Sequence, residues 1–95
     1  MPSPKEIVRQ QRRAKEVRRQ RFLRARNVSA RSTVRTFVRR AREAIEAGDT
    51  DAAEAAIRDA QSRLDSAARK GVIHRRKAAR SVARLVRQLR AANAA

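Results

Sequence analysis

Residues 30–49 read ARSTVRTFVRRAREAIEAGD, and this stretch decides the fold. Its apolar residues recur every three or four positions, which places them on one stripe of an α-helix with arginines beside and behind it. The stripe consists of Ala30, Val34, Phe37, Val38, Ala41 and Ile45. Gly48 suits the left-handed position that follows a helix C-terminus. The stretch therefore predicts the end of a helix with one buried side and one charged side.

Upstream of this stretch, the chain contains no Gly or Pro back to Pro4. Ser3-Pro4-Lys5-Glu6 has the pattern of a capping box with Pro at the first helical position. One helix is therefore predicted over residues 4–46, about 60 Å long. Residues 4–28 lack a continuous apolar face and carry basic residues on nearly every side, so we expect them to project. In the free protein we expect this extension to fray, because arginines at helical spacing repel each other.

Downstream, two shorter helices are predicted over residues 50–70 and 73–92, separated by Gly71. Asp49, Thr50 or Asp51 can cap the first of them, whereas the second lacks a strong cap. Their apolar stripes are Ala53, Ala56, Ile57, Ala60, Leu64 and Ala67, and then Ala78, Ala79, Val82, Leu85, Val86 and Leu89. Three stripes of this size can close into a small bundle. The prediction is an all-α, antiparallel three-helix bundle with a long, projecting basic N-terminal helix, forming a single domain over residues 1–95.

Charge is sorted along the chain, whose formal net charge is +17. Residues 1–42 carry a net charge of +13, residues 43–66 a net charge of −5, and residues 67–95 a net charge of +9. Two basic segments around an acidic one indicate a bound polyanion that contacts the basic segments, and nucleic acid is the obvious candidate. The acidic segment should face away from it.

Several function classes are excluded or disfavoured. The chain has no Cys and one His, so a zinc site is not expected, and we expect no metal or other cofactor. No apolar run approaches the roughly 18 residues of a membrane span, and no secretory signal begins the chain, which favours a cytoplasmic protein. The acidic residues lie along a turn and an exposed helix face without a cleft, so an enzyme is not expected.

The residues alone leave RNA and duplex DNA open. Helix-turn-helix spacing, zinc ligands and a leucine zipper are all missing, and Phe37 belongs to the core stripe, so aromatic stacking is not expected. Binding by shape and backbone phosphates remains. A sequence-neutral DNA-compacting protein is the main alternative. A membrane-active basic helix is a third hypothesis, for which the N-terminal segment lacks a continuous apolar face.

Two segments carry a resemblance to a known family. Residues 27–40 read NVSARSTVRTFVRR and residues 68–80 read ARKGVIHRRKAAR, with the turn AIEAGD at 44–49 between them. This combination resembles the bacterial small-subunit ribosomal protein twenty family. The resemblance implies a three-helix bundle that binds small-subunit ribosomal RNA early in assembly, at its five-prime domain and its long penultimate helix. It implies no small-molecule substrate and no homo-oligomer.

The resemblance also implies binding residues by position. The first RNA contact would comprise Arg24, Arg26, Asn27, Ser29, Arg31, Ser32, Arg35, Thr36, Arg39 and Arg40, and the second would comprise His74, Arg75, Lys77, Arg80 and Arg84. Basic character adds Arg12, Arg13, Arg19, Arg76 and Arg87, with Arg76 standing where the family usually has Asn. The hydroxyls of Ser29, Ser32 and Thr36 are expected to donate to phosphate or the ribose 2′-hydroxyl.

Overall fold

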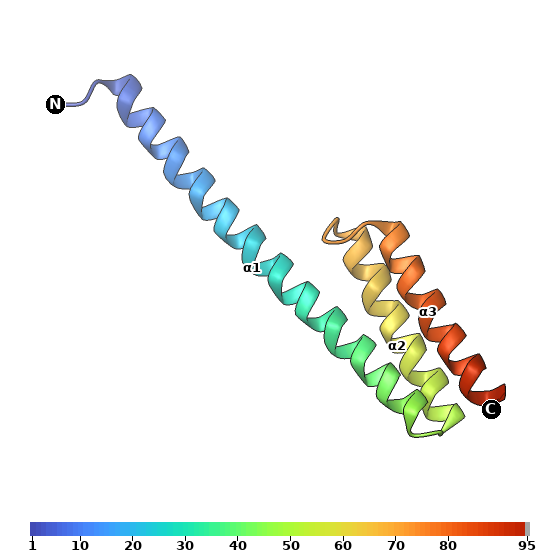
Figure 1. Ribbon diagram of the computed structural model, residues 1–95. Helices are drawn as coiled ribbons and strands as arrows, with labels where there is room; N and C mark the ends of the chain where they lie inside the picture. The colour runs from blue at the N-terminus through green and yellow to red at the C-terminus, as the bar shows by residue number, and fades with distance from the viewer. Residues whose placement is uncertain (95) are drawn as a thin grey trace.

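The computed structural model describes residues 1–94 and contains three α-helices (Figure 1). They are α1 (Pro4–Glu46), α2 (Thr50–Arg69) and α3 (Arg75–Ala94). Helices α2 and α3 lie beside the C-terminal half of α1, and its N-terminal half projects beyond them. The Cα atoms span 75 Å along the longest axis and 21 and 14 Å across it. The predicted all-α three-helix bundle with a long N-terminal helix is confirmed.

Helix α1 begins with the predicted capping box. The backbone N–H of Glu6 donates to Ser3 Oγ at 3.3 Å, and the N–H of Ser3 donates to a Glu6 carboxylate oxygen at 3.2 Å. Pro4 follows the cap at the start of the helix, where a missing N–H has no consequence. These contacts satisfy backbone donors that the first turn would otherwise leave to solvent. The extension therefore has a defined start although it packs against nothing.

Each of the two turns contains a glycine with positive φ. Gly48 has φ of 80° and follows α1, after which the Asp49 carboxylate accepts from the N–H of Ala52 at 3.1 Å and caps α2. Gly71 has φ of 76° and ends α2 in a Schellman motif. In that motif the N–H of Val72 donates to the carbonyl of Ala67 at 3.0 Å, and Val72 itself is buried. The second turn is therefore anchored by an apolar side chain.

The core is narrow and rich in alanine. Leu64 and Leu85 are its largest fully buried side chains, and Ala41, Ala53 and Ala60 have no exposed surface at all. Small residues at the contacts let the helices approach closely, which compensates for the small apolar area that alanine buries. The predicted stripes supply every buried residue of this core except Val72, and Ala79 is the one stripe residue that is exposed. Ala79 is rotated by about 100° from the buried Ala78, so it falls at the edge of the stripe.

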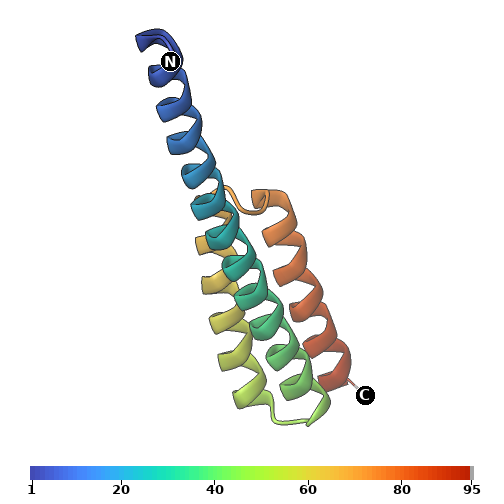
Figure 2. The same cartoon turned by 90° about the vertical axis from the view of Figure 1, so that its left-hand side faces the viewer.

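The three helices do not contact one another equally. Contact is most extensive between α1 and α2 and least extensive between α1 and α3. Figure 2 shows the C-terminal half of α1 lying over the seam between the other two helices. Two sides of α1 therefore face a neighbouring helix, and a third side faces outward. This arrangement decides which basic residues of the three helices lie next to one another within the bundle.

Candidate nucleic-acid interface

The projecting part of α1 is charged and exposed throughout. Every residue from 1 to 22 is exposed, and residues 4–22 carry eight Lys or Arg against two Glu. The predicted binding residues Arg12, Arg13 and Arg19 lie here. A helix with cations on all sides and no buried side is stabilised by surrounding anions rather than by packing. The exposed, basic surface of this segment therefore suits a partner that presents phosphates on several sides.

A basic groove lies between α1 and α3 within the bundle. Its walls carry five cations, namely Arg31, Arg35, Arg39, Arg42 and Lys77, and its volume is about 320 Å³. Val34, Val38, Leu64 and Ile73 supply the apolar part of its lining. No carboxylate lines this α1–α3 groove, and of its cations only Arg39 has an acidic partner, Glu43, which lies outside the lining. It is suited to a phosphate backbone that lies along α1.

A smaller basic notch lies on the other side of α1, against α2. Arg26 and Ser29 of α1 face Arg63, Ser66 and Lys70 of α2 across a hollow of about 220 Å³. This α1–α2 notch also contains no carboxylate. Its three cations come from two helices, so only the folded chain brings them together. Phosphate is again the ligand that this set of side chains would bind.

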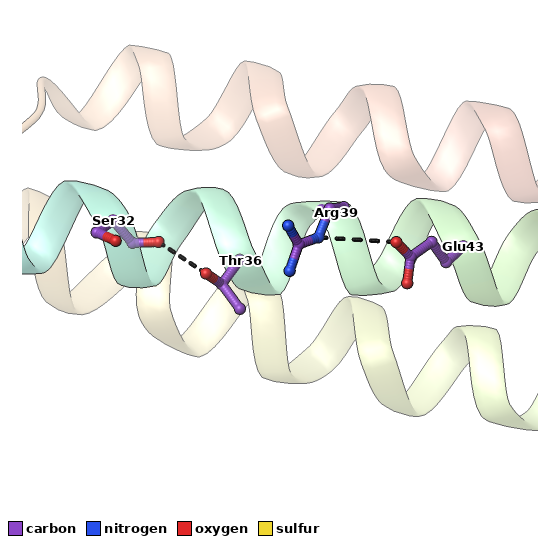
Figure 3. Close-up of polar contacts among 4 residues, drawn as sticks. All are labelled: Ser32, Thr36, Arg39 and Glu43. Carbon is purple, nitrogen blue, oxygen red and sulfur yellow. Dashed lines mark hydrogen bonds and ion pairs between the residues drawn. The ribbon is translucent and has the colours of Figure 1, made fainter.

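Very little of the positive charge is neutralised within the protein. Among residues 1–94 the single ion pair joins Arg39 Nε to Glu43 Oε1 at 3.7 Å, and both side chains are about two-thirds exposed. An exposed pair at this distance contributes at most about 1 kcal/mol and is screened by salt. Arg39 can therefore leave Glu43 for a phosphate at little cost. Figure 3 shows this pair on the outward side of α1.

Short hydroxyl groups also follow one another along α1, with Ser32 and Thr36 on this outward side and Ser29 and Thr33 turned toward the α1–α2 notch. Thr36 Oγ1 donates to the carbonyl of Ser32 at 3.0 Å, as Figure 3 shows, and Thr33 Oγ1 donates likewise to the carbonyl of Ser29. This bond uses the Thr36 proton in the free protein, so the expectation that Thr36 donates to phosphate or a ribose 2′-hydroxyl stays a prediction that requires its hydroxyl to rotate. Its oxygen can still accept from a ribose 2′-hydroxyl. Ser29 and Ser32 are exposed, so the expectation for these two stands as a prediction.

His74 forms the start of α3. Its carbonyl accepts from the N–H groups of Lys77 and Ala78, and its Nδ1 accepts from the N–H of Arg76 at 3.1 Å. The imidazole therefore caps a helix that the sequence left without a strong cap. Because Nδ1 accepts a hydrogen bond, the neutral ring carries its proton on Nε2. That N–H belongs to an exposed side chain and is available to donate to a partner.

The sequence of the protein matches a known family. A sequence model of the family described as ribosomal protein S20 matches residues 9–90. This chain belongs to the ribosomal protein S20 family. The predicted resemblance is thereby confirmed, and the family is one of structural ribosomal proteins rather than enzymes.

The curated S20 relatives match across most of their length. Small ribosomal subunit protein bS20 of Chelativorans sp. (strain BNC1) is 52% identical over 68 residues, which cover 72% of this chain and 77% of that protein. The protein of the same name from Legionella pneumophila (strain Corby) is 51% identical over 69 residues, covering 73% and 78%. That of Thermomicrobium roseum is 47% identical over 78 residues, covering 82% and 79%.

The S20 residues predicted from the sequence are distributed over several surfaces. Eighteen of the twenty are exposed, and the half-buried exceptions are Asn27 and Thr36. The fold joins Arg31, Arg35 and Arg39 to Lys77 in the α1–α3 groove but directs Arg26 and Ser29 into the opposite notch. Neither hollow contains Arg80, Arg84 or Arg87 of α3, or Arg40. The predicted first contact is therefore divided between two sides of α1.

Asn27 is the least accessible predicted S20 binding residue. Its Oδ1 atom is buried and has no hydrogen-bond partner among the described residues. Asn27 shares a shallow hollow on α1 with Leu23 and Val28, near the end of the bundle. A buried carbonyl oxygen without a donor costs free energy, so a donor from a bound partner would be favourable here. The prediction that Asn27 contacts RNA gains a physical reason.

Three basic residues of this S20 chain were missed by sequence reasoning. Arg42 lines the α1–α3 groove, and Arg63 and Lys70 line the α1–α2 notch. For Arg42 the signal is present in the sequence, because it follows Arg35 and Arg39 at helical spacing on the same flank. For Arg63 the signal is hidden, because it lies in the acidic segment and only packing turns it toward α1.

Within the described residues, the structure lacks both a membrane-spanning helix and a cluster of metal-binding side chains. No helix within residues 1–94 combines the length and the apolar run that crossing a membrane requires. In the same part of the chain, no group of three or more His, Asp or Glu side chains is arranged to hold a metal ion.

Proposed function

We propose that this protein is a structural constituent of the small ribosomal subunit that binds small-subunit ribosomal RNA directly and supports an early stage of subunit assembly. The relatives named small ribosomal subunit protein bS20 support the assignment of the protein to the small subunit. The observation that carries the proposal is the α1–α3 groove, in which cations of both predicted RNA contacts line one carboxylate-free surface.

The geometry of the groove suits a nucleic-acid backbone. Arg31, Arg35 and Arg39 recur every four residues, so they are spaced by about 6 Å along the axis of α1. Successive phosphates of one strand are separated by a comparable distance, so each guanidinium can meet its own phosphate. Arginine also binds phosphate in a bidentate manner, which adds orientation to the charge attraction. Lys77 closes the other side of the groove.

The projecting helix supports a folded RNA rather than a single strand as the partner. It extends well past the bundle and is basic all round, so anions are required on several sides at once. A large folded RNA offers phosphates on several sides of a cleft. Thr36 Oγ1 and the Nε2–H of His74 are candidates for contacts to ribose hydroxyls, which would favour RNA over DNA. In this proposal the five-prime domain and the long penultimate helix are the regions bound.

Footprinting on naked small-subunit RNA tests the proposal. The purified protein should protect discrete positions in the five-prime domain and in the penultimate helix from chemical probing at moderate salt, with no other ribosomal protein present. Protection without other proteins is what an early assembly role requires. Equal affinity for duplex DNA and for unrelated RNA at matched salt would overturn the proposal and favour a DNA-compacting protein instead.

A further inference from the structure

One aromatic side chain of the protein has no structural role in the fold. Phe22 lies on the projecting part of α1 and is 69% exposed, whereas Phe37, the other phenylalanine, packs against the core. An aromatic ring in water on a helix that is otherwise rich in arginine is costly unless a partner covers it. Sequence reasoning expected no stacking aromatic, and the exposure of Phe22 changes that expectation.

Phe22 is aligned with the α1–α2 notch. It precedes Arg26 by four residues, so the two side chains lie on the same side of α1, about 6 Å apart along its axis. Ser29 continues the same side one turn further on and, like Arg26, lines the notch. Arg18 and Arg19 flank Phe22 on its other side along the helix. An apolar ring therefore stands between two clusters of cations.

One of the cations in the notch is held in place before any ligand binds. The guanidinium of Arg63 lies over the ring of Phe37, with its Cζ atom 4.7 Å from the ring centroid. Such a stack restricts Arg63 without neutralising it. Arg26 and Lys70 complete the set from α1 and α2. An anion entering the notch would meet three uncompensated cations, of which one is already oriented.

We propose that Phe22 and the α1–α2 notch together form a site for one unpaired nucleotide of the bound RNA. The base stacks on the ring of Phe22, and the backbone phosphate next to it lies between Arg26, Arg63 and Lys70. The separation of ring and notch by about one helical turn matches the reach from a base to its own phosphate. The proposal rests on the proposed function, because it assumes that the protein binds small-subunit RNA.

RNA is favoured as the occupant by charge. The notch is lined by three cations, serine hydroxyls and no carboxylate, and the flanks of Phe22 are arginines. A basic protein surface would therefore meet repulsion, and a neutral one would cover these cations without supplying a counter-charge. Unpaired bases in folded RNA are recognised mainly by stacking on aromatic or guanidinium planes. Because every base offers a flat face, such stacking would add affinity at an unpaired position.

The test measures the dissociation constant for naked small-subunit RNA by filter binding. The Phe22→Leu variant removes the aromatic face and keeps an apolar, helix-forming side chain, so it should bind roughly 5- to 150-fold more weakly. Phe22→Tyr keeps the stacking face and should bind like the wild type. Val8→Ala is the matched control and should bind like the wild type, because Val8 is also an exposed apolar residue of α1, at 43%, but lines neither the notch nor the hollow of Asn27.

A double-mutant cycle tests whether ring and notch share a ligand. Lys70→Gln alters the notch from α2, so its effect can couple to that of Phe22→Leu only through a bound group. Non-additive losses support one nucleotide that spans both, whereas additive losses overturn it. Equal binding by Phe22→Leu and the wild type would also overturn this proposal while leaving RNA binding intact. If the wild type itself fails to bind, the proposed function fails first.

Discussion

Arg63 of α2 and Phe37 of α1 are in direct contact, with the arginine Cζ 4.7 Å from the centroid of the ring. Arg40 lies over the same ring at 5.2 Å. One half-buried aromatic side chain therefore joins the core on one side and positions two cations at the surface on the other. In a bundle in which half of the buried core residues are alanine, this ring links the stability of the fold to the geometry of the binding surface.

Replacing this ring should destabilise the bundle. Phe37→Leu removes both cation–π contacts and some apolar packing, so we expect a loss of about 1–2 kcal/mol in the free energy of unfolding. Urea denaturation followed by far-UV circular dichroism measures it. Phe22→Leu makes the same chemical change at an exposed site and should stay within about 0.5 kcal/mol of the wild type. Equal losses for the two variants would contradict the structural role of Phe37.

Removing one groove cation should weaken RNA binding and its salt dependence together. Arg35→Ala and Arg42→Ala should each lower the slope of log K against log salt by roughly one phosphate contact. Arg80→Ala is expected to do the same if α3 forms the second contact. Arg58→Ala makes the same change in net charge on α2, outside both hollows, and should leave the slope nearly unchanged. A slope that Arg42→Ala leaves intact would remove Arg42 from the contact.

The two roles of His74 can be separated by substitution. Asparagine is a good N-cap residue, so His74→Asn should keep the stability of α3 within about 0.5 kcal/mol. His74→Ala loses the cap and should cost about 1 kcal/mol, as thermal unfolding would show. If Nε2–H donates to RNA, both variants should bind RNA more weakly than the wild type. Wild-type affinity of the asparagine variant would limit His74 to capping.

Gly71 should resist replacement for reasons of backbone conformation alone. A Cβ added there meets no atom within 4 Å, so crowding plays no part, but φ is 76°. Gly71→Ala should therefore destabilise the protein by about 1–2 kcal/mol. Gly71→Asn should cost less, because asparagine tolerates the left-handed region better. Equal unfolding midpoints for the alanine variant and the wild type would contradict this reasoning.

The projecting part of α1 should gain order from the partner. Residues 4–22 bury nothing, and their arginines repel each other, so their backbone amides should exchange rapidly in the free protein. Bound RNA neutralises that repulsion and should slow exchange there markedly. Hydrogen–deuterium exchange with and without small-subunit RNA measures both states, and amides within α2 serve as the internal reference. Strong protection of residues 7–20 in the free protein would contradict the expectation.

Much of the fold follows from local patterns. The capping box, the two glycines and the spacing of the apolar residues each act within a few residues of the chain, so they predict three helices and their core stripes. The start of α3 is harder to predict from the sequence, because histidine is an unusual N-cap residue. Ala79 was assigned to the core wrongly, since a stripe read from sequence does not show how far the neighbouring helix reaches.

The sequence by itself determined that this protein is helical, basic at both ends and a member of a ribosomal protein family, because propensity, charge and motif are properties of the chain. Only the tertiary structure decided how the basic residues are grouped. It placed Arg31 and Lys77 in one groove, turned Arg63 from an acidic segment toward Arg26, and left Phe22 uncovered. Those groupings depend on which sides of the helices meet, and that depends on contacts between residues far apart in the chain.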